Sequence, residues 1–342
     1  MVRNKEAEKG PAMKKLYTPI LLLSASLTLA TLGCDPRKQA TPESVSSSPA
    51  ASEDAGAGGI ASALERTRAA VSPIEVTNFA DSKRWHDGKA EVAKYKGTRM
   101  RYGKQREFEL TLVQVKEPFD ARLLVKSDTP GSEETIPVMK TQVVYTMPTE
   151  NYPYQFASST FSRRDNPFAL VKSVTTSHEW CGITTKYLDL RGAKPVWRYH
   201  SYFEDESQGD LELTWPDRGV FEEQLFLAVR ALPLKVGLRE ELQVFSGQIN
   251  SHARTPSWRK GVLKVVDKRE VEDAAGTSHE VWHIEVSFED GSTPLIYDVG
   301  TDDARTLVHH SGTGGFELRL ARRVRWAYWS FGEPSPFGAG AE

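Results

Sequence analysis

The chain has 342 residues, with 44 Lys and Arg against 46 Asp and Glu, so its formal net charge is −2. That balance lacks the concentrated positive charge on which nucleic-acid binding depends, and we expect no nucleic-acid partner. The only two cysteines are Cys34 and Cys181. If Cys34 carries a lipid, as predicted below, no pair is left for an intrachain disulfide, and the fold must rest on its hydrophobic core.

The first 33 residues carry the pattern of an export signal. Lys14 and Lys15 precede an uncharged, mostly apolar stretch over 16–33 that ends in small residues. This order of charge, apolar run and small-residue cleavage site is typical of a secretory signal peptide. The glycine directly before Cys34 resembles a bacterial lipobox, so we predict removal of 1–33 and lipidation of Cys34, with palmitate among the acyl chains.

A membrane-spanning helix is the alternative for this stretch. Pro19 interrupts the apolar run, whose core is short for a bilayer. The lipobox departs from the usual pattern at Thr31, where leucine is the common residue. Lipid anchoring predicts a place in the bacterial cell envelope, facing the periplasm or the cell surface. Cleavage removes five positive and two negative charges, so the net charge falls from −2 to −5.

The segment 34–62 is predicted to be a disordered tether. It consists largely of Ser, Ala, Gly and Pro and has almost no large apolar side chains. Such a segment cannot bury enough surface to offset its chain entropy. A lipid anchor followed by a flexible tether would attach the folded part of the chain to a membrane.

The rest of the chain predicts a mainly β fold. Phe108, Leu110 and Leu112 alternate with polar residues, and this period of two describes strands with one buried and one exposed face. The same alternation occurs from Trp282 to Phe288. Further strands are expected at 138–146, 152–161, 168–180, 184–191, 196–203, 262–271, 294–298, 305–310 and 315–329.

One long helix is predicted, beginning at Asp217 as its N-cap, with apolar Phe221, Leu225 and Val229 at helical spacing. A shorter helix is expected at 61–71. We therefore expect curved antiparallel sheets, sandwich-like or half-barrel-like, with one main helix packed across them. The parts expected are a β-rich part at 63–215, the helix with a second β-rich part at 216–331, and a flexible tail at 332–342.

Four stretches in the order "WHDGKAEVAKYKGTRMRYG", "NYPYQFASSTF", "HEWCG" and "YHSYFE" resemble a family of uncharacterised bacterial envelope lipoproteins. The resemblance covers roughly residues 85–205. The later part, from "LPLKVG" to "TLVHH", is similar to a β-rich domain of unknown function found in periplasmic proteins. Family members sometimes bear the label septum formation inhibitor Maf, but the Ser-Pro-Arg-Arg signature of Maf nucleotide pyrophosphatases is missing here. The resemblance implies an envelope lipoprotein and assigns no chemistry.

The catalytic candidates are Cys181, its neighbour Glu179 and the distant His200, which together would suit a thiol enzyme or an envelope hydrolase. Residues at odd separation in a strand point to opposite faces, so His178 is not expected to activate Cys181. Glu179 would raise the thiol pKa, which opposes reactivity. We therefore favour a structural Cys181 that behaves as a small buried hydrophobe, and a protein that is not an enzyme.

No metal site or cofactor is predicted. The eight histidines are dispersed, and the sequence has no H-E-x-x-H, C-x-x-C, P-loop, dinucleotide or G-x-S-x-G pattern. His279 and His283 are expected on the exposed face of one strand, about 13 Å apart and too distant to share an ion. His309 and His310 should point to opposite faces.

The C-terminal segment "RLARRVRWAYWSF" places Arg319, Arg323, Arg325 and Trp329 on one face of a predicted strand. The first interpretation is an edge strand whose solvated arginines discourage sheet pairing. The alternative is a surface for anionic headgroups or a protein partner, because Arg and Trp are favoured at both.

These observations favour a non-enzymatic, lipid-anchored β protein of the bacterial envelope. It would bind an apolar ligand, a lipid or an envelope partner in a groove of the curved sheet. The alternatives are the thiol enzyme or hydrolase centred on Cys181 and a purely structural scaffold.

Overall fold

The computed structural model describes residues 73–132, 134–191, 194–253, 256–330, 332 and 334–338. All of them fall within one compact unit, Glu53–Glu342. The predicted signal peptide, lipidated Cys34, tether and helix at 61–71 lie outside the described residues, as does part of the predicted tail. None of the helices in the described ranges is long and apolar enough to cross a membrane.

The described residues form sixteen strands and six short helical elements. The strands are β1 (Ala90–Arg101), β2 (Lys104–Asp120), β3 (Val125–Lys126), β4 (Thr135–Met147), β5 (Tyr154–Arg163), β6 (Leu170–Glu179), β7 (Gly182–Asp189), β8 (Val196–His200), β9 (Gln208–Glu212), β10 (Gly219–Phe221), β11 (Arg239–Phe245), β12 (Trp258–Glu272), β13 (Ser278–Phe288), β14 (Leu295–Gly300), β15 (Leu307–Ser311) and β16 (Glu317–Trp326). The helical elements are η1 (Phe79–Asp81), η2 (Lys83–His86), η3 (Glu222–Gln224), α2 (Leu225–Ala228), η4 (Val229–Ala231) and η5 (Thr313–Gly315).

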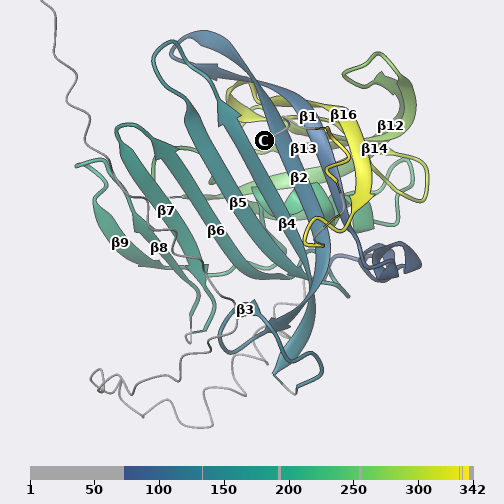
Figure 1. Ribbon diagram of the computed structural model, residues 1–342, viewed down its shortest axis with the longest axis horizontal. Coiled ribbons are helices and arrows are strands. Elements are labelled where there is room, and N and C mark those ends of the chain that lie inside the picture. The colour runs from purple at the N-terminus through teal and green to yellow at the C-terminus, as the bar shows by residue number, and fades with distance from the viewer. Residues whose placement is uncertain are drawn as a thin grey trace, which may run out of the picture. The chain divides into compact units, whose positions relative to one another are not determined.

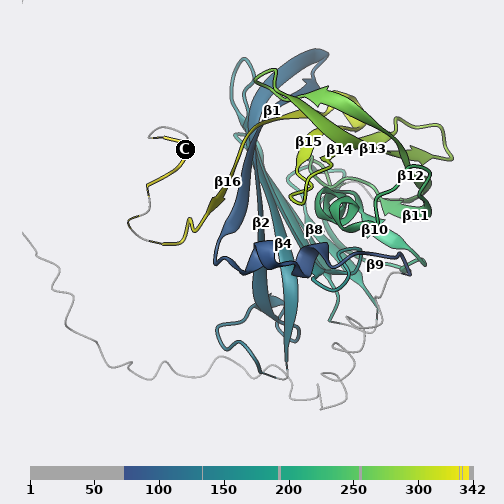
Figure 2. The same cartoon turned by 90° about the vertical axis from the view of Figure 1, so that its right-hand side faces the viewer.

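All sixteen strands belong to one curved sheet that does not close on itself. Its order is β10-β11-β12-β13-β14-β15-β16-β1-β2-β4-β5-β6-β7-β8-β9, with β3 beside β2. The paired strands are antiparallel apart from β10 and β11, which run parallel. Figure 1 shows β4 to β7 side by side in the long part of the sheet, and Figure 2 shows the sheet bending around the short helical segment. The predicted mainly β fold with curved antiparallel strands is confirmed.

The strands form where the sequence alternates. In β5 the buried residues Tyr154, Phe156 and Ser158 alternate with the more exposed Gln155 and Ala157, as a period of two requires. The predicted strands 138–146 and 262–271 lie inside β4 and β12. The prediction of β16 as an edge strand is wrong, because this strand lies between β15 and β1.

The helical segment begins later than the sequence predicted, and Asp217 is not its N-cap. Gly219–Phe221 instead form β10 and pair in parallel with Gln243–Phe245. Arg218 takes a left-handed φ of 57° in the turn before β10. Helical geometry starts only at Glu222 and continues to Ala231 as η3, α2 and η4. The pairing with β11 therefore overrides the helical periodicity of the first turn.

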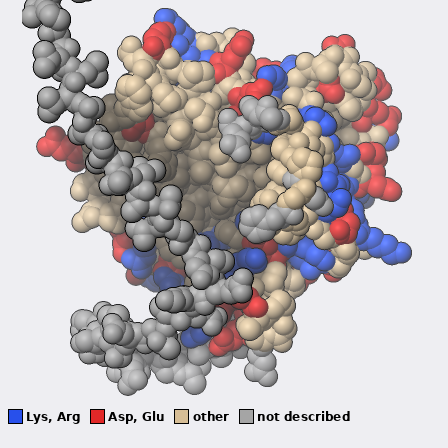
Figure 3. Space-filling model, in the orientation of Figure 1, with Lys and Arg blue, Asp and Glu red and all other residues tan. Residues whose placement is uncertain are grey.

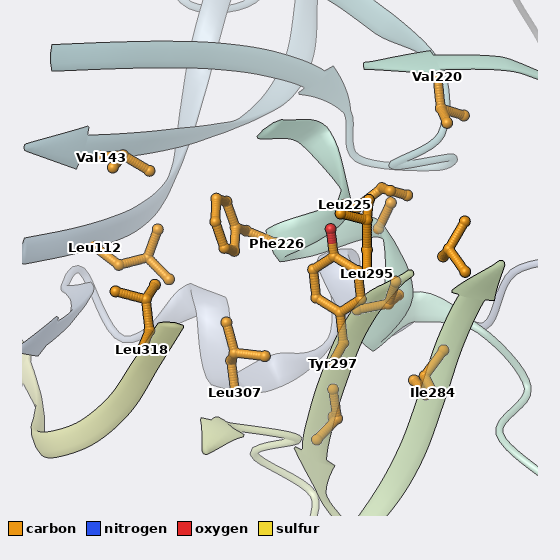
Figure 4. Packing of buried hydrophobic residues seen from close by; sticks show 14 of the residues in the cluster. Leu112, Val143, Val220, Leu225, Phe226, Ile284, Leu295, Tyr297, Leu307 and Leu318 are labelled. Atoms are coloured by element: carbon orange, nitrogen blue, oxygen red, sulfur yellow. The ribbon is translucent and has the colours of Figure 1, made fainter. Parts of the chain in front are cut away.

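The helical segment lies on the concave side of the sheet and fills it. Leu225, Phe226 and Val229 are buried in one cluster with Leu295 and Tyr297 (Figure 4). Each such buried side chain contributes about 1.5–3 kcal/mol. The apolar groove that the sequence suggested between sheet and helix is thus occupied by the chain's own side chains.

A buried ion pair ties the segment to the sheet. Arg230 is 1% exposed and lies 2.8 Å from Glu91 of β1, which also lies 2.6 Å from Arg84. Arg230 donates to the amide oxygen of Gln114, whose Nε2 in turn donates to the carbonyl of Phe226 at 3.3 Å. Burial opposes ionisation of Glu91, but the surrounding arginines outweigh it and lower its pKa. The carboxylate therefore stays charged and holds the segment in place.

Candidate functional site

Cys181 is exposed in the two-residue turn between β6 and β7. The expectation of a buried structural thiol is wrong, because Gly182 starts the next strand at once and the turn projects Trp180 and Cys181 into solvent. The Tyr152 hydroxyl lies 3.4 Å from the Cys181 sulfur.

The structure does not assemble the three catalytic candidates. His200 is paired across the sheet with Thr185. Thr185 is four residues along β7 from Cys181, a separation of roughly 13 Å in an extended strand. The carboxylate of Glu179 is engaged by the hydroxyl of Tyr154, not by the thiol. No hydrogen bond among the described residues joins Cys181 to a histidine.

Large apolar side chains are exposed at one end of the sheet. They form what we call the apolar rim, comprising Met100, Tyr102, Trp180, Ile183 and Tyr202, each between 47% and 78% exposed. These residues lie in or beside the β1–β2, β6–β7 and β8–β9 connections. Successive antiparallel strands reverse direction, so these three connections emerge at the same end of the sheet. Topology therefore gathers the rim from segments distant in the sequence.

Specific contacts organise the rim. The hydroxyls of Tyr102 and Tyr154 lie 2.5 Å apart, and the Arg101 guanidinium lies 4.7 Å and 4.6 Å from their ring centroids. Tyr152 stacks on Trp180 with ring centroids 5.6 Å apart. Burial raises the pKa of Tyr154, so its phenol stays protonated. The arrangement is a supported aromatic surface and not a set of isolated side chains.

Tyr202 is positioned by a glycine. Its ring covers Gly182 so closely that an added Cβ would lie 2.2 Å from Cδ2 of the ring. Only glycine at this place lets the β8–β9 connection lie against the β6–β7 turn. This contact joins Tyr202 to the part of the rim that contains Trp180.

An uncharged sheet face lies beside these connections. Toward this end of β4 to β7, the partly exposed positions that carry no charge include Gln142, Val144, Ala157, Ser159, Val174, Thr176 and Thr185, whereas Lys140 and Lys172 lie further along the same face. Figure 3 shows this side of the molecule as a hollowed, mostly uncharged area with Lys, Arg, Asp and Glu around its border. A surface of this kind carries little electrostatic preference of its own.

The β16 arginines are engaged in ion pairs. Arg319 lies 2.8 Å from Glu317, Arg325 lies 2.5 Å from Asp87, and Arg323 lies 3.6 Å from Glu91. Their charges are thus partly neutralised within the fold. Trp329, the fourth residue of this predicted surface, is 49% exposed beyond the end of β16.

The prediction that His283 lies on an exposed face is wrong. His283 is buried and its Nδ1 lies 2.8 Å from Asp298, its cross-strand partner. His309 reaches the other oxygen of Asp298 at 2.7 Å, whereas His310 is buried on the opposite face. His279 lies 2.9 Å from Asp273. Within the described ranges, no group of three or more His, Cys, Asp and Glu is arranged to hold a metal ion.

The loop at 246–253 bridges the gap between the two ends of the sheet. Glu222 accepts from the Gly247 amide at 3.2 Å, and Glu223 accepts from the Ile249 amide at 3.2 Å. From β7, the Lys186 ammonium donates to the Gln248 carbonyl at 2.6 Å. The same loop is fixed to the β8–β9 connection. Its His252 lies 2.8 Å from Glu206, and its Ala253 amide donates to that carboxylate at 2.7 Å.

A cavity of about 60 Å³ with both polar and apolar lining residues lies behind this loop. Its lining includes Arg99, Glu222, Glu223, Phe226, Gly247, Ile249, Tyr297, His310, Gly312, Thr313 and Phe316. Aromatic rings form much of the wall, and two carboxylates and one guanidinium face it. Glu222 is ion-paired with Arg259 at 3.1 Å, so its charge is already compensated.

Burial perturbs the ionisable groups around the cavity. Burial together with the neighbouring Glu222 carboxylate raises the pKa of Glu223 to about 7. Burial lowers the pKa of Lys186 to about 7 and that of His310 to about 3. Sequence reasoning missed these residues, because Glu222 and Glu223 fell within the predicted helix and Lys186 within the predicted strand 184–191.

The fold defines the class: an unclosed, curved antiparallel sheet around a short helical segment. No family model and no curated protein matches this sequence. Among solved structures, the chain is similar to a beta-barrel-like protein of the domain of unknown function DUF1849 from Brucella abortus. That match has a TM-score of 0.40 and 12% identity over 70% of this chain and 98% of the other. It is also similar to a DUF1089 family protein from Pseudomonas aeruginosa, with a TM-score of 0.33 and 16% identity over 51% of this chain and 84% of the other.

Proposed function

We propose that this chain is a non-enzymatic, lipid-anchored binding protein of the bacterial cell envelope whose apolar rim contacts a lipid or another apolar ligand. The observation that carries the proposal is the rim itself. Soluble surfaces rarely gather large apolar side chains in this way unless they bind something. Tyr and Trp suit such a role, because each has an apolar body and a polar group that tolerates water.

Because packed core residues fill the concave side of the sheet, the apolar rim is the better candidate for the binding surface. The helical segment already fills the concave side, so an apolar ligand has no large groove to enter there. Trp180 and Tyr202 are 78% and 58% exposed, and burying both would remove considerable apolar area from water at about 25 cal/mol per Å².

The anchoring part of the proposal is supported by the sequence pattern before Cys34. It predicts that Cys34→Ser abolishes incorporation of a labelled fatty acid and leaves uncleaved precursor in cells. A variant that is processed and localised like the natural chain would contradict the lipoprotein assignment.

The binding part is tested with Trp180→Ala/Tyr202→Ala and with Trp329→Ala as the matched control. Trp329 is also exposed, but it lies beyond the last residue of β16 and not in the rim. The full-length proteins would be extracted gently from membranes and examined by native mass spectrometry for bound lipid. We expect the rim variant to lose most bound lipid while the control keeps it. Equal retention by all three proteins, or loss only in the Trp329 variant, would refute the rim as the binding surface.

A further inference from the structure

Two buried hydrogen-bonding atoms at the cavity behind the 246–253 loop have no partner among the described residues. They are Oε2 of Glu223 and the hydroxyl of Tyr297, whose side chains are 4% and 0% exposed. Both residues line the cavity. Figure 4 shows the Tyr297 hydroxyl directed toward the helical segment that carries Phe226. Buried polar groups almost always have a partner, so atoms of this kind mark a place where one is expected.

The charges at the cavity are separated and not paired with each other. Arg99 donates to the Tyr145 hydroxyl at 2.9 Å and to the Ile249 carbonyl at 2.8 Å, but it forms no ion pair with any described carboxylate. Burial raises the pKa of Glu222, and the nearby Arg259 and Arg99 guanidinium groups partly oppose that rise. Glu223 uses Oε1 to accept from the Gln248 and Ile249 amides, and its Oε2 has no partner among the described residues. The lining therefore offers a cationic donor, Arg99, and an anionic acceptor, Glu223, as separate binding positions.

The size of the cavity limits its occupant. A water molecule needs about 10–15 Å³ measured in this way, so about 60 Å³ holds roughly four to six non-hydrogen atoms. The occupant must donate to a carboxylate oxygen and accept from a phenol and a guanidinium. An ammonium and a carboxylate joined by one carbon meet both demands.

We propose that this cavity binds a small zwitterion, an α-amino acid of glycine or alanine size. Its ammonium donates to the Glu223 carboxylate, and its carboxylate accepts from the Arg99 guanidinium and the Tyr297 hydroxyl. The site is distinct from the apolar rim and does not depend on the function proposed for it. It lies between the loops that contain Gly247 and Gly312, both at the end of the sheet where the rim lies.

The ionisable groups around Glu223 give the proposal a pH signature. Glu223 must be charged to hold an ammonium, and its pKa is about 7, so its charged fraction rises about tenfold from pH 6 to pH 8. His310 and Tyr297 remain neutral over this range. Lys186 loses its charge as the pH rises through about 7. This removes a cation that competes with the ligand's ammonium for the charge of Glu223. The other charged groups facing this region are Arg99, Glu222 and Arg259.

The test is equilibrium dialysis of the full-length protein with labelled glycine at pH 6 and pH 8. Glycinamide, which lacks the carboxylate, and acetate, which lacks the ammonium, serve as comparison ligands. We expect glycine to bind about tenfold more tightly at pH 8 and both comparison ligands to bind at least tenfold more weakly. Absence of glycine binding at millimolar concentration, or equal binding of glycinamide or acetate, would overturn the proposal.

Two variants connect the binding to these atoms. Tyr297→Phe removes one hydroxyl and should weaken glycine binding about tenfold while keeping the pH dependence. Glu223→Gln keeps the shape and should remove the pH dependence. Tyr328→Phe, at an exposed tyrosine beyond β16, is the control and should bind like the natural chain. Unchanged glycine affinity in a folded Tyr297→Phe variant would also overturn the assignment.

Discussion

Replacing Glu223 by Gln should change how the stability of this protein depends on pH. Glu223 is buried, and its pKa is raised from the ordinary 4.5 to about 7 by burial and by Glu222. Between these two pH values the folded state holds a proton that the unfolded state has released. The group therefore adds stability below pH 4.5, and this contribution is lost as the pH rises through 7.

The size of the effect follows from the pKa values. At about 1.4 kcal/mol for each pKa unit, a rise from 4.5 to about 7 corresponds to roughly 3 kcal/mol. Glutamine does not titrate but can still accept from the amides of Gln248 and Ile249. The free energy of unfolding of the natural chain, minus that of Glu223→Gln, should thus fall by about 3 kcal/mol between pH 4.5 and pH 7.5.

Urea unfolding at several pH values between 4.5 and 7.5 measures this difference directly. Other carboxylates cancel because they are present in both proteins. Lys186 contributes mainly above this window, since its pKa is about 7 when folded and 10.5 when exposed. Glu109→Gln is the control. Lys96 lowers the pKa of Glu109, so that group titrates below the window. Parallel pH profiles for the natural chain and Glu223→Gln would refute the reasoning.

Two further predictions concern the buried ion pair and the exposed thiol. Arg230→Met leaves the buried Glu91 carboxylate with less compensating positive charge and should lower the free energy of unfolding by about 3–5 kcal/mol. The control Arg122→Met, at an exposed arginine, should lower it by under about 1 kcal/mol. A loss below about 1 kcal/mol for Arg230→Met in urea unfolding would contradict the role of the pair. In a Cys34→Ser background, Cys181 should react with a disulfide reagent in the native state nearly as fast as in denaturant, because it is exposed; strong protection in the native state would show that the turn buries it.

The strands could be predicted from the sequence because their cause is local. Alternation in segments such as Phe108–Leu112 sets one face against the core wherever the strand is placed. The same reasoning predicted that His309 and His310 face apart, which the structure confirms. However, the alternation within a strand does not indicate which strands will lie beside it. For this reason the sequence analysis placed β16 at an edge of the sheet, although β15 and β1 flank it.

The helix prediction shows how tertiary pairing overrides periodicity. Phe221, Leu225 and Val229 have helical spacing, yet Phe221 belongs to a strand because β11 offers it a parallel partner. The same override shifted the start of the helical segment to Glu222 and left Glu223 buried. The burial of Glu223 depends on the loop at 246–253, and nothing in its local sequence indicates it.

The candidate sites divide in the same way. The sequence alone determined the mainly β class, the positions of many strands but not those of β1 and β11, and the pattern that predicts export and lipidation at Cys34. Only the tertiary structure decided that Cys181 is exposed and distant from His200, and that Glu223, Tyr297 and Arg99 share a cavity. The physical reason is that strand formation depends on neighbours two residues apart, whereas a site depends on side chains that different strands and loops bring together. That convergence is fixed by the order of strands in the sheet, which the alternation of a single strand does not encode.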